Sequence, residues 1–107
     1  MVDKKRDASA PVKILVAEDS AVDRMILETM LKKGGYDVVL AEDGNQAVTL
    51  FQEENPDLVF LDVVMPNLNG MDAARKIRSL SGDVFTPIVF LTSVSYTHLT
   101  LPTKPSG

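Results

Sequence analysis

Short apolar runs alternate along this chain with segments of helical periodicity, and this alternation constrains the fold more than any other feature. The four runs are four to six residues long and span 12–17, 36–41, 58–61 and 88–91. Because they are mostly continuous rather than alternately apolar and polar, they are typical of strands in a parallel sheet that helices cover on both faces. The predicted element order is βαβαβαβ, and the predicted fold class is an α/β doubly wound parallel sheet.

The segments between the runs carry the signals of helix starts and ends. Ser20 and Asp23 have the spacing of a helix N-terminus, and Gly34 can end the helix that they begin. A second helix opens at Asp43 and ends before Asn55. The apolar residues that share a helix face are Val22, Ile26 and Met30 in the first helix, and Ala73, Ala74, Ile77 and Leu80 in the third.

Length and charge limit the function classes that remain. The 107 residues suffice for one small domain, and the net charge of −4 argues against nucleic acid binding by the module itself. The absence of Cys excludes disulfides and thiolate chemistry. No apolar run approaches the roughly 20 residues of a membrane span, and residues 1–11 lack the apolar centre of a signal peptide. We therefore expect a flexible leader over 1–11 and a cytoplasmic protein without a membrane partner.

Residues that can carry chemistry stand where the predicted strands end. Glu18 and Asp19 follow the first strand, Asp62 ends the third and Thr92 follows the fourth. Ligands of doubly wound sheets bind beyond the carboxyl ends of the strands, so these side chains are expected to meet. Three carboxylates repel one another unless a cation is present, and Mg²⁺, which prefers oxygen ligands, is the predicted one. A carboxylate beside Mg²⁺ can attack phosphorus, and the Thr92 hydroxyl can hydrogen-bond a phosphoryl oxygen.

Each of these residues also has a structural explanation when it is taken alone. Glu18 and Asp19 before a helix can cap its N-terminus and interact with the helix dipole. Asp62 before a loop is commonly a turn residue, and a hydroxyl residue such as Thr92 ends many strands. Acidic residues and a hydroxyl at three strand ends of one sheet are much rarer by chance, so the set favours a functional site.

Four segments of the chain resemble those of a known family. They are 13–20 with its acidic pair, 36–47, 58–71 with Asp62 and the following loop, and 87–93. Together they are similar to the receiver domains of two-component response regulators. The resemblance covers about residues 12–93 and implies a flavodoxin-like sheet with the strand order 2-1-3-4-5.

The resemblance also implies a role for each site residue. Asp62 is the expected phosphoacceptor, which takes a phosphoryl group from a sensor histidine kinase or a phosphotransfer protein. Asp19 is expected to bind Mg²⁺ directly, Glu18 directly or through water, and Asp62 and the main-chain carbonyl of Val64 are the further expected ligands. Thr92 is expected to grip the phosphoryl group and to move inward on activation. The family often has Asp where this chain has Glu18, a difference that keeps the charge and can alter metal affinity.

Such a domain is a signalling module rather than an enzyme, and it assists at most its own phosphorylation and dephosphorylation. The parent protein is expected to be either a lone receiver or a receiver joined to an output domain. An inactive receiver-like domain that only binds other proteins is the alternative. A phosphatase of the haloacid dehalogenase type needs a second Asp where this chain has Val64. A nucleotide binder needs a phosphate-binding loop where Glu18 and Asp19 would repel phosphate.

The C-terminal part departs from the family pattern. Receivers require a lysine at the end of a fifth strand, and Lys104 lies only 12 positions after Thr92. A crossover connection alone takes about a dozen residues, so Lys104 is rejected and the lysine, the fifth strand and the last helices are expected to be missing. Residues 94–107 resemble a translated sequencing adapter and are predicted to be a non-native, irregular tail in which His98 has no role. We therefore expect a partial receiver that is marginally stable, prone to aggregate through its fourth strand, and a poor phosphoacceptor.

Overall fold

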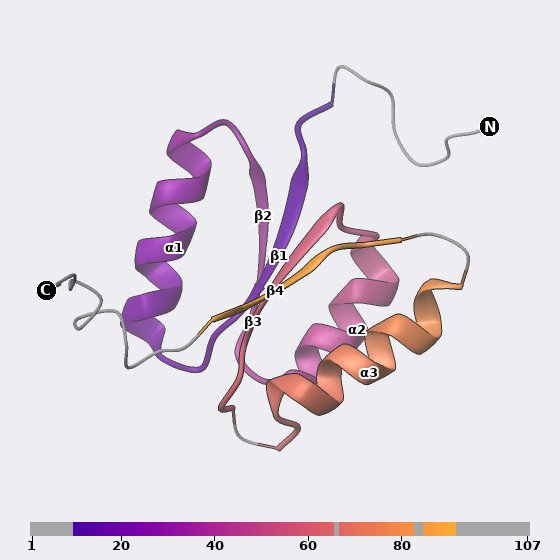
Figure 1. Cartoon of the computed structure of the whole chain (residues 1–107). Coiled ribbons are helices and arrows are strands. Elements are labelled where there is room, and N and C mark those ends of the chain that lie inside the picture. The colour runs from indigo at the N-terminus through magenta and orange to yellow at the C-terminus, as the bar shows by residue number, and fades with distance from the viewer. Residues whose placement is uncertain (1–9, 66, 83–84, 92–107) are drawn as a thin grey trace, which may run out of the picture.

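Seven elements make up the described part of the chain. The computed structural model describes residues 10–65, 67–82 and 85–91. The strands are β1 (Lys13–Ala17), β2 (Asp37–Ala41), β3 (Leu58–Asp62) and β4 (Ile88–Leu91), and the helices are α1 (Ala21–Lys33), α2 (Gly44–Glu54) and α3 (Gly70–Ser81). Strands and helices alternate throughout, so the predicted βαβαβαβ order is confirmed (Figure 1).

The strands form one parallel sheet with helices on both faces. The order within the sheet is β2-β1-β3-β4, and every neighbouring pair is parallel. Helix α1 lies on one side of the sheet, whereas α2 and α3 lie together on the other (Figure 1). The predicted doubly wound class is therefore confirmed, and the strand order agrees with the first four positions of the order that the resemblance implies.

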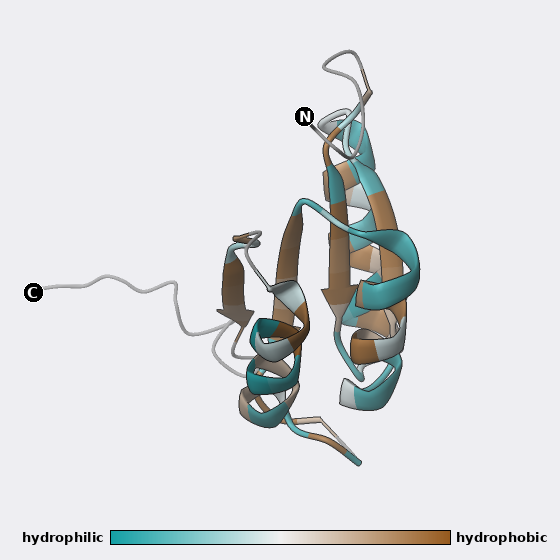
Figure 2. Cartoon of the chain, turned by 90° about the vertical axis from the view of Figure 1, so that its right-hand side faces the viewer, coloured by the Kyte–Doolittle hydropathy of each residue, from teal (hydrophilic) through white to brown (hydrophobic). Residues whose placement is uncertain are grey.

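The main apolar core lies between the sheet and the pair α2 and α3. Leu15, Leu61 and Ile77 are fully buried in it, and each side chain of this size contributes about 1.5–3 kcal/mol when it leaves water. Small residues on the helices, Ala47 and Ala73, are also fully buried and allow the helices to approach the sheet closely. Figure 2 shows the result as apolar strands inside and hydrophilic stretches on the helices.

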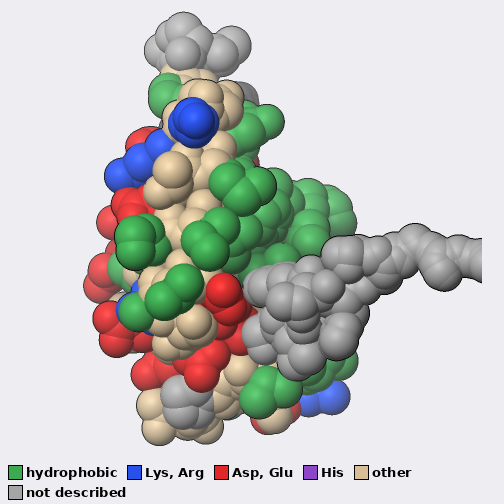
Figure 3. Space-filling model, turned by 90° about the vertical axis from the view of Figure 1, so that its left-hand side faces the viewer, with side chains coloured by type: hydrophobic (Ala, Val, Ile, Leu, Met, Phe, Trp, Pro, Cys, Tyr) green, Lys and Arg blue, Asp and Glu red, His purple; other side chains and the backbone are tan. Residues whose placement is uncertain are grey.

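The apolar face of α1 is largely exposed, although its helical spacing is typical of a buried face. The exposed fractions of Val22, Ile26 and Met30 are 61%, 49% and 62%. The physical reason is that α1 packs on β1 and β2 only, so within the described residues no helix lies beside it over β3 and β4. Hydrophobic side chains consequently gather on this side of the molecule (Figure 3).

Strand β4 lies at the edge of the described sheet, as the sequence predicts. Val89 and Phe90 on this strand are 43% and 41% exposed. An apolar edge strand is a template for pairing with another chain, so the expected aggregation stays a prediction for this strand. None of the described helices combines the length and the apolarity that crossing a membrane requires.

All three helices begin at the carboxyl edge of the sheet, and each has a side-chain cap there. The side chains of Ser20, Asp43 and Asn69 accept hydrogen bonds from the main-chain N–H groups of Asp23, Gln46 and Asp72, respectively. Such caps satisfy donors that the first helical turn leaves free. They hold the three loops between strand and helix in place, and these loops surround the candidate site.

Candidate functional site

Three carboxyl groups meet at the carboxyl edge of the sheet. One carboxylate oxygen each from Glu18, Asp19 and Asp62 lies within 4.8 Å of the other two. Glu18 and Asp62 are buried, with exposed fractions of 0% and 1%, whereas Asp19 is exposed. The parallel pairing of β1 with β3 brings them together, because Ala17 pairs with Leu61 and the chain reaches the next residue of each strand side by side. We call these three residues the acidic cluster.

Main-chain groups hold the two buried carboxyl groups in place. The N–H of Ser20 donates to Glu18 Oε2 at 3.0 Å, and the N–H of Val64 donates to Asp62 Oδ1 at 3.3 Å. The Glu18 main chain is also fixed, since its N–H donates to the carbonyl of Ala41 on β2 at 3.1 Å. The second oxygens, Glu18 Oε1 and Asp62 Oδ2, are buried without a hydrogen-bond donor among the described residues. They are the atoms that a ligand of positive charge would satisfy.

The raised pKa values of the two buried carboxyl groups also indicate a site for a positive charge. Burial is the main cause that raises the pKa of Glu18 from 4.5 to about 7; the adjacent Asp62 raises it further, while the Ser20 N–H opposes the rise. Burial also raises the pKa of Asp62; the adjacent Glu18 and the hydrogen bond from the Val64 N–H oppose this rise, and the negative charge of Asp19 adds to it. Two adjacent buried carboxylates are costly to ionise together, so the pair retains a proton near neutral pH unless a cation replaces it.

A divalent cation with a preference for oxygen fits this donor set. The acidic cluster offers three carboxylates, two of which have an oxygen atom that is buried and lacks a donor. Mg²⁺ and Ca²⁺ are bound by such oxygen ligands, whereas the soft metals prefer sulfur or imidazole. Glu18, Asp19 and Asp62 are therefore the residues that could hold a metal ion. Because Asp19 is exposed, an ion can reach the acidic cluster from solvent.

Close packing of the loop after β3 keeps Asp62 at the site. A Cβ atom at Gly70 would overlap the main-chain carbonyl of Asp62, so the helix start can lie this close only without a side chain. The N–H of Gly70 also donates to the Val63 carbonyl at 2.9 Å. Further along the loop, Asn67 Nδ2 donates to Asp43 Oδ2 at 3.0 Å and thereby ties the loop to the start of α2.

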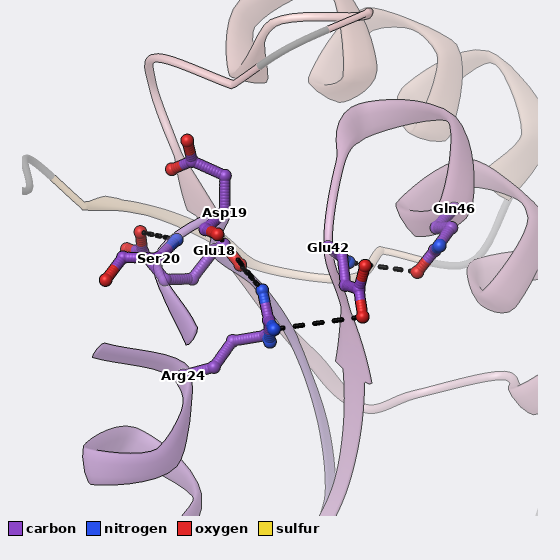
Figure 4. A network of polar contacts seen from close by, with 6 residues as sticks. All are labelled: Glu18, Asp19, Ser20, Arg24, Glu42 and Gln46. Carbon is purple, nitrogen blue, oxygen red and sulfur yellow. Dashed lines mark hydrogen bonds and ion pairs between the residues drawn. The ribbon is translucent and has the colours of Figure 1, made fainter. Parts of the chain in front are cut away.

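One residue that contacts the site, Arg24, was not predicted from the sequence. Arg24 of α1 donates from Nη1 to the main-chain carbonyls of Glu18 and Asp19, and its Nη2 pairs with Glu42 (Figure 4). The only signal in the sequence is a cation in the first turn of a helix, where the helix dipole disfavours positive charge. That signal does not reveal which groups the guanidinium contacts.

Comparison with known proteins identifies the family. The family model of the response regulator receiver domain matches residues 14–101. The chain belongs to the response regulator receiver domain family. The match also reaches into the segment 94–107, whose interpretation as a non-native tail stays a prediction.

Individual receivers and response regulators are similar over most of this chain. The transcriptional regulatory protein PdtaR of Mycobacterium tuberculosis is 43% identical over 102 residues, which are 94% of this chain and 48% of that protein. The receiver domain of the sensor histidine kinase PA1611 from Pseudomonas aeruginosa, with a magnesium ion in its active site cleft, superposes with a TM-score of 0.74 at 35% identity and covers 83% of this chain and 73% of its own. The chemotaxis protein CheY4 of Vibrio cholerae gives 0.72 at 33% identity, with 76% and 68% covered.

The structure places some of the predicted receiver residues and leaves others outside its described part. Glu18, Asp19 and Asp62 come together, and Val64 lies two residues after Asp62 in the adjoining loop. Thr92 and the rejected Lys104, like the leader to residue 9 and the tail, lie outside the described residues. The chain spans about half the length of PdtaR, the first curated relative that it matches.

Proposed function

We propose that Asp62 is the phosphoacceptor of this receiver domain and that it takes its phosphoryl group from a sensor histidine kinase or a phosphotransfer protein. The observation that carries the proposal is the buried Asp62 Oδ2, which lacks a hydrogen-bond donor in the described structure and lies beside Glu18 and Asp19. A residue with only a turn role at the surface would have no reason to be buried beside two further acids.

The acidic cluster is proposed to hold Mg²⁺. Asp19 binds the ion directly, Glu18 binds it directly or through water, and Asp62 and the Val64 main-chain carbonyl are the further protein ligands. The magnesium ion in the PA1611 receiver supports this choice, because that domain is 35% identical to this chain. When bound, Mg²⁺ neutralises the negative charge that otherwise opposes the approach of a phosphoryl group.

The chain's own residues prepare Asp62 for transfer. The Val64 N–H donates to Asp62 Oδ1 and so orients the carboxylate. Attack by this carboxylate on phosphorus forms an acyl phosphate while the phosphorus–nitrogen bond of the phosphohistidine breaks, and the imidazole nitrogen keeps that electron pair. Thr92 is proposed to hydrogen-bond the transferred group. The domain is the acceptor in this step and not a catalyst that turns over.

The biological setting stays a prediction in its details. Because the chain spans about half of PdtaR, whose name describes a transcriptional regulator, an output domain beyond the receiver is the proposed partner within the parent protein. The receiver itself, with net charge −4, is not the part proposed to contact nucleic acid. A cytoplasmic location, where kinase and regulator would meet, is proposed on the same basis.

Labelling with a small phosphodonor tests the proposal. The protein to be tested joins residues 12–93 to the fifth strand and last helices of a related receiver, and we call it the completed receiver. This fusion supplies the lysine that is predicted to be missing. We expect Mg²⁺-dependent incorporation of phosphate that Asp62→Asn abolishes, whereas Asp72→Asn on exposed α3 retains it. Unchanged labelling of the Asp62→Asn protein would refute the proposed function. Complete absence of labelling in the completed receiver that keeps Asp62 would favour the alternative, an inactive receiver-like domain that only binds other proteins.

A further inference from the structure

Arg24 connects two of the loops that surround the acidic cluster. Its Nη1 donates to the main-chain carbonyl of Glu18 at 2.8 Å and to that of Asp19 at 3.2 Å. Its Nη2 lies 3.8 Å from Oε2 of Glu42 at the end of β2. Although Arg24 is a long cationic residue, its side chain is only 16% exposed. Figure 4 shows the guanidinium between Glu18 and Glu42.

The position of Arg24 is not explained by the stability of its helix. It lies in the first turn of α1, where the helix dipole is positive and disfavours a cation. Ser20 already caps this helix by accepting the N–H of Asp23. The contacts of the guanidinium are instead with carbonyl groups outside the helix, and these belong to the two acidic residues that follow β1.

The main chain of Glu18 is consequently held from two directions. Its N–H donates to the Ala41 carbonyl on β2, and its own carbonyl accepts from Arg24. The main chain of Glu42, whose side chain pairs with Arg24, is also held, because its N–H donates to Gln46 Oε1 at 3.0 Å. Since a side chain can only point where its main chain allows, this arrangement sets the direction of the Glu18 and Asp19 carboxyl groups toward Asp62.

We propose that Arg24 is a positioning residue for the acidic cluster: it fixes the Glu18 and Asp19 main chain so that their carboxyl groups are in place before a divalent cation binds. The inference rests on the proposed function, because it assigns to Arg24 a part in the Mg²⁺ site of the receiver. It makes a prediction opposite in sign to simple electrostatics. Removing a nearby positive charge should tighten Mg²⁺ binding because it relieves Coulomb repulsion, whereas loss of positioning should weaken binding.

Mg²⁺ titration of the 107-residue chain and its variants separates these two effects. The chemical shifts of the Ser20, Val64 and Gly70 amides report binding by the folded molecules alone. In Arg24→Lys the charge is kept, but one ammonium group cannot reproduce the forked contacts, so we expect binding about tenfold weaker. In Arg24→Met we expect a loss of about 10–100-fold, the range seen when groups that orient metal ligands are removed. Arg75→Met removes an equal charge from exposed α3 and should bind nearly as the native chain does.

The outcomes distinguish the inference from the proposed function. If the native chain shows no saturable Mg²⁺ response, the proposed function fails and the role of Arg24 fails with it. If the native chain binds Mg²⁺ and Arg24→Lys binds equally well, only the positioning role is refuted. The positioning role alone is also refuted if Arg24→Lys lowers the free energy of unfolding in chelator but leaves the Mg²⁺ affinity of the folded molecules unchanged. Arg24 would then only stabilise the fold. Tighter binding by Arg24→Met would assign its effect to charge and would also refute the inference.

Discussion

Replacing Glu18 by Gln should stabilise the metal-free protein above pH 7. The substitution keeps the shape of the side chain and removes one of two adjacent buried carboxyl groups. The new amide can also donate to Asp62 Oδ2, which otherwise lacks a donor in the described structure. A residue proposed to bind metal would thus lower stability when the metal is absent, as is common for functional sites.

The size of this effect follows from the pKa of Glu18. Burial raises the pKa of Glu18 from 4.5 to about 7, so the folded state binds its proton more tightly than the unfolded chain does. The stability from this proton is fully present below pH 4.5 and is lost as the pH rises through about 7. At about 1.4 kcal/mol for each pH unit between these values, the loss is at most about 3–4 kcal/mol.

Urea unfolding in chelator at pH 5 and pH 8 measures the difference. We expect Glu18→Gln to exceed the native chain in free energy of unfolding at pH 8 by up to about 3–4 kcal/mol, and the gap to shrink strongly at pH 5. Glu53→Gln, the same change at an exposed position of α2, serves as the control and should show no such gap. Equal stability of native and Glu18→Gln proteins at pH 8, or a gap independent of pH, would refute the reasoning.

Three further predictions concern the metal, the loop and the sheet edge. Saturating Mg²⁺ should raise the free energy of unfolding by about 2.7 kcal/mol at a concentration of 100 times Kd, and thermal unfolding should show that Asp62→Asn loses most of this gain. Gly70→Ala should cost about 1–3 kcal/mol, because its Cβ would displace the Asp62 main chain. Gly34→Ala should cost much less, because its Cβ would lie 3.1 Å from the Tyr36 ring and in ordinary contact, at 3.4 Å, with the Leu31 carbonyl; urea unfolding compares the two variants. Val89→Lys places a charge on the exposed edge strand β4 and should reduce self-association in light scattering, and unchanged association would show that another surface is responsible.

The sequence predicts the strands and helix starts well because their causes are local. The apolar runs that form most of β1 and β3, and caps such as Ser20, depend on neighbouring residues alone. The approach of Asp62 to Glu18 could also be predicted, since the carboxyl ends of parallel strands share one edge. Family resemblance was needed for the strand order, which makes β1 and β3 neighbours, and for the role of each residue in phosphoryl transfer.

What the sequence does not predict depends on contacts between distant segments. The spacing of Val22, Ile26 and Met30 indicates an apolar helix face but not whether another element covers it. The raised pKa of Glu18 arises from burial, which the residue type does not reveal. Arg24 gains its contacts only because α1 begins beside the turn that follows β1 and faces the end of β2.

Chemical identification of the phosphorylated residue tests the central proposal most directly. The completed receiver and the 107-residue chain are treated with a small phosphodonor and Mg²⁺, and borohydride then reduces any acyl phosphate to an alcohol that peptide mapping can locate. We predict reduction at position 62 in the completed receiver, none after chelation of Mg²⁺, and little in the 107-residue chain, which is predicted to lack the family's lysine. Label on Asp19, Glu18 or another residue, with Asp62 unmodified, would contradict the assignment of Asp62 as the phosphoacceptor.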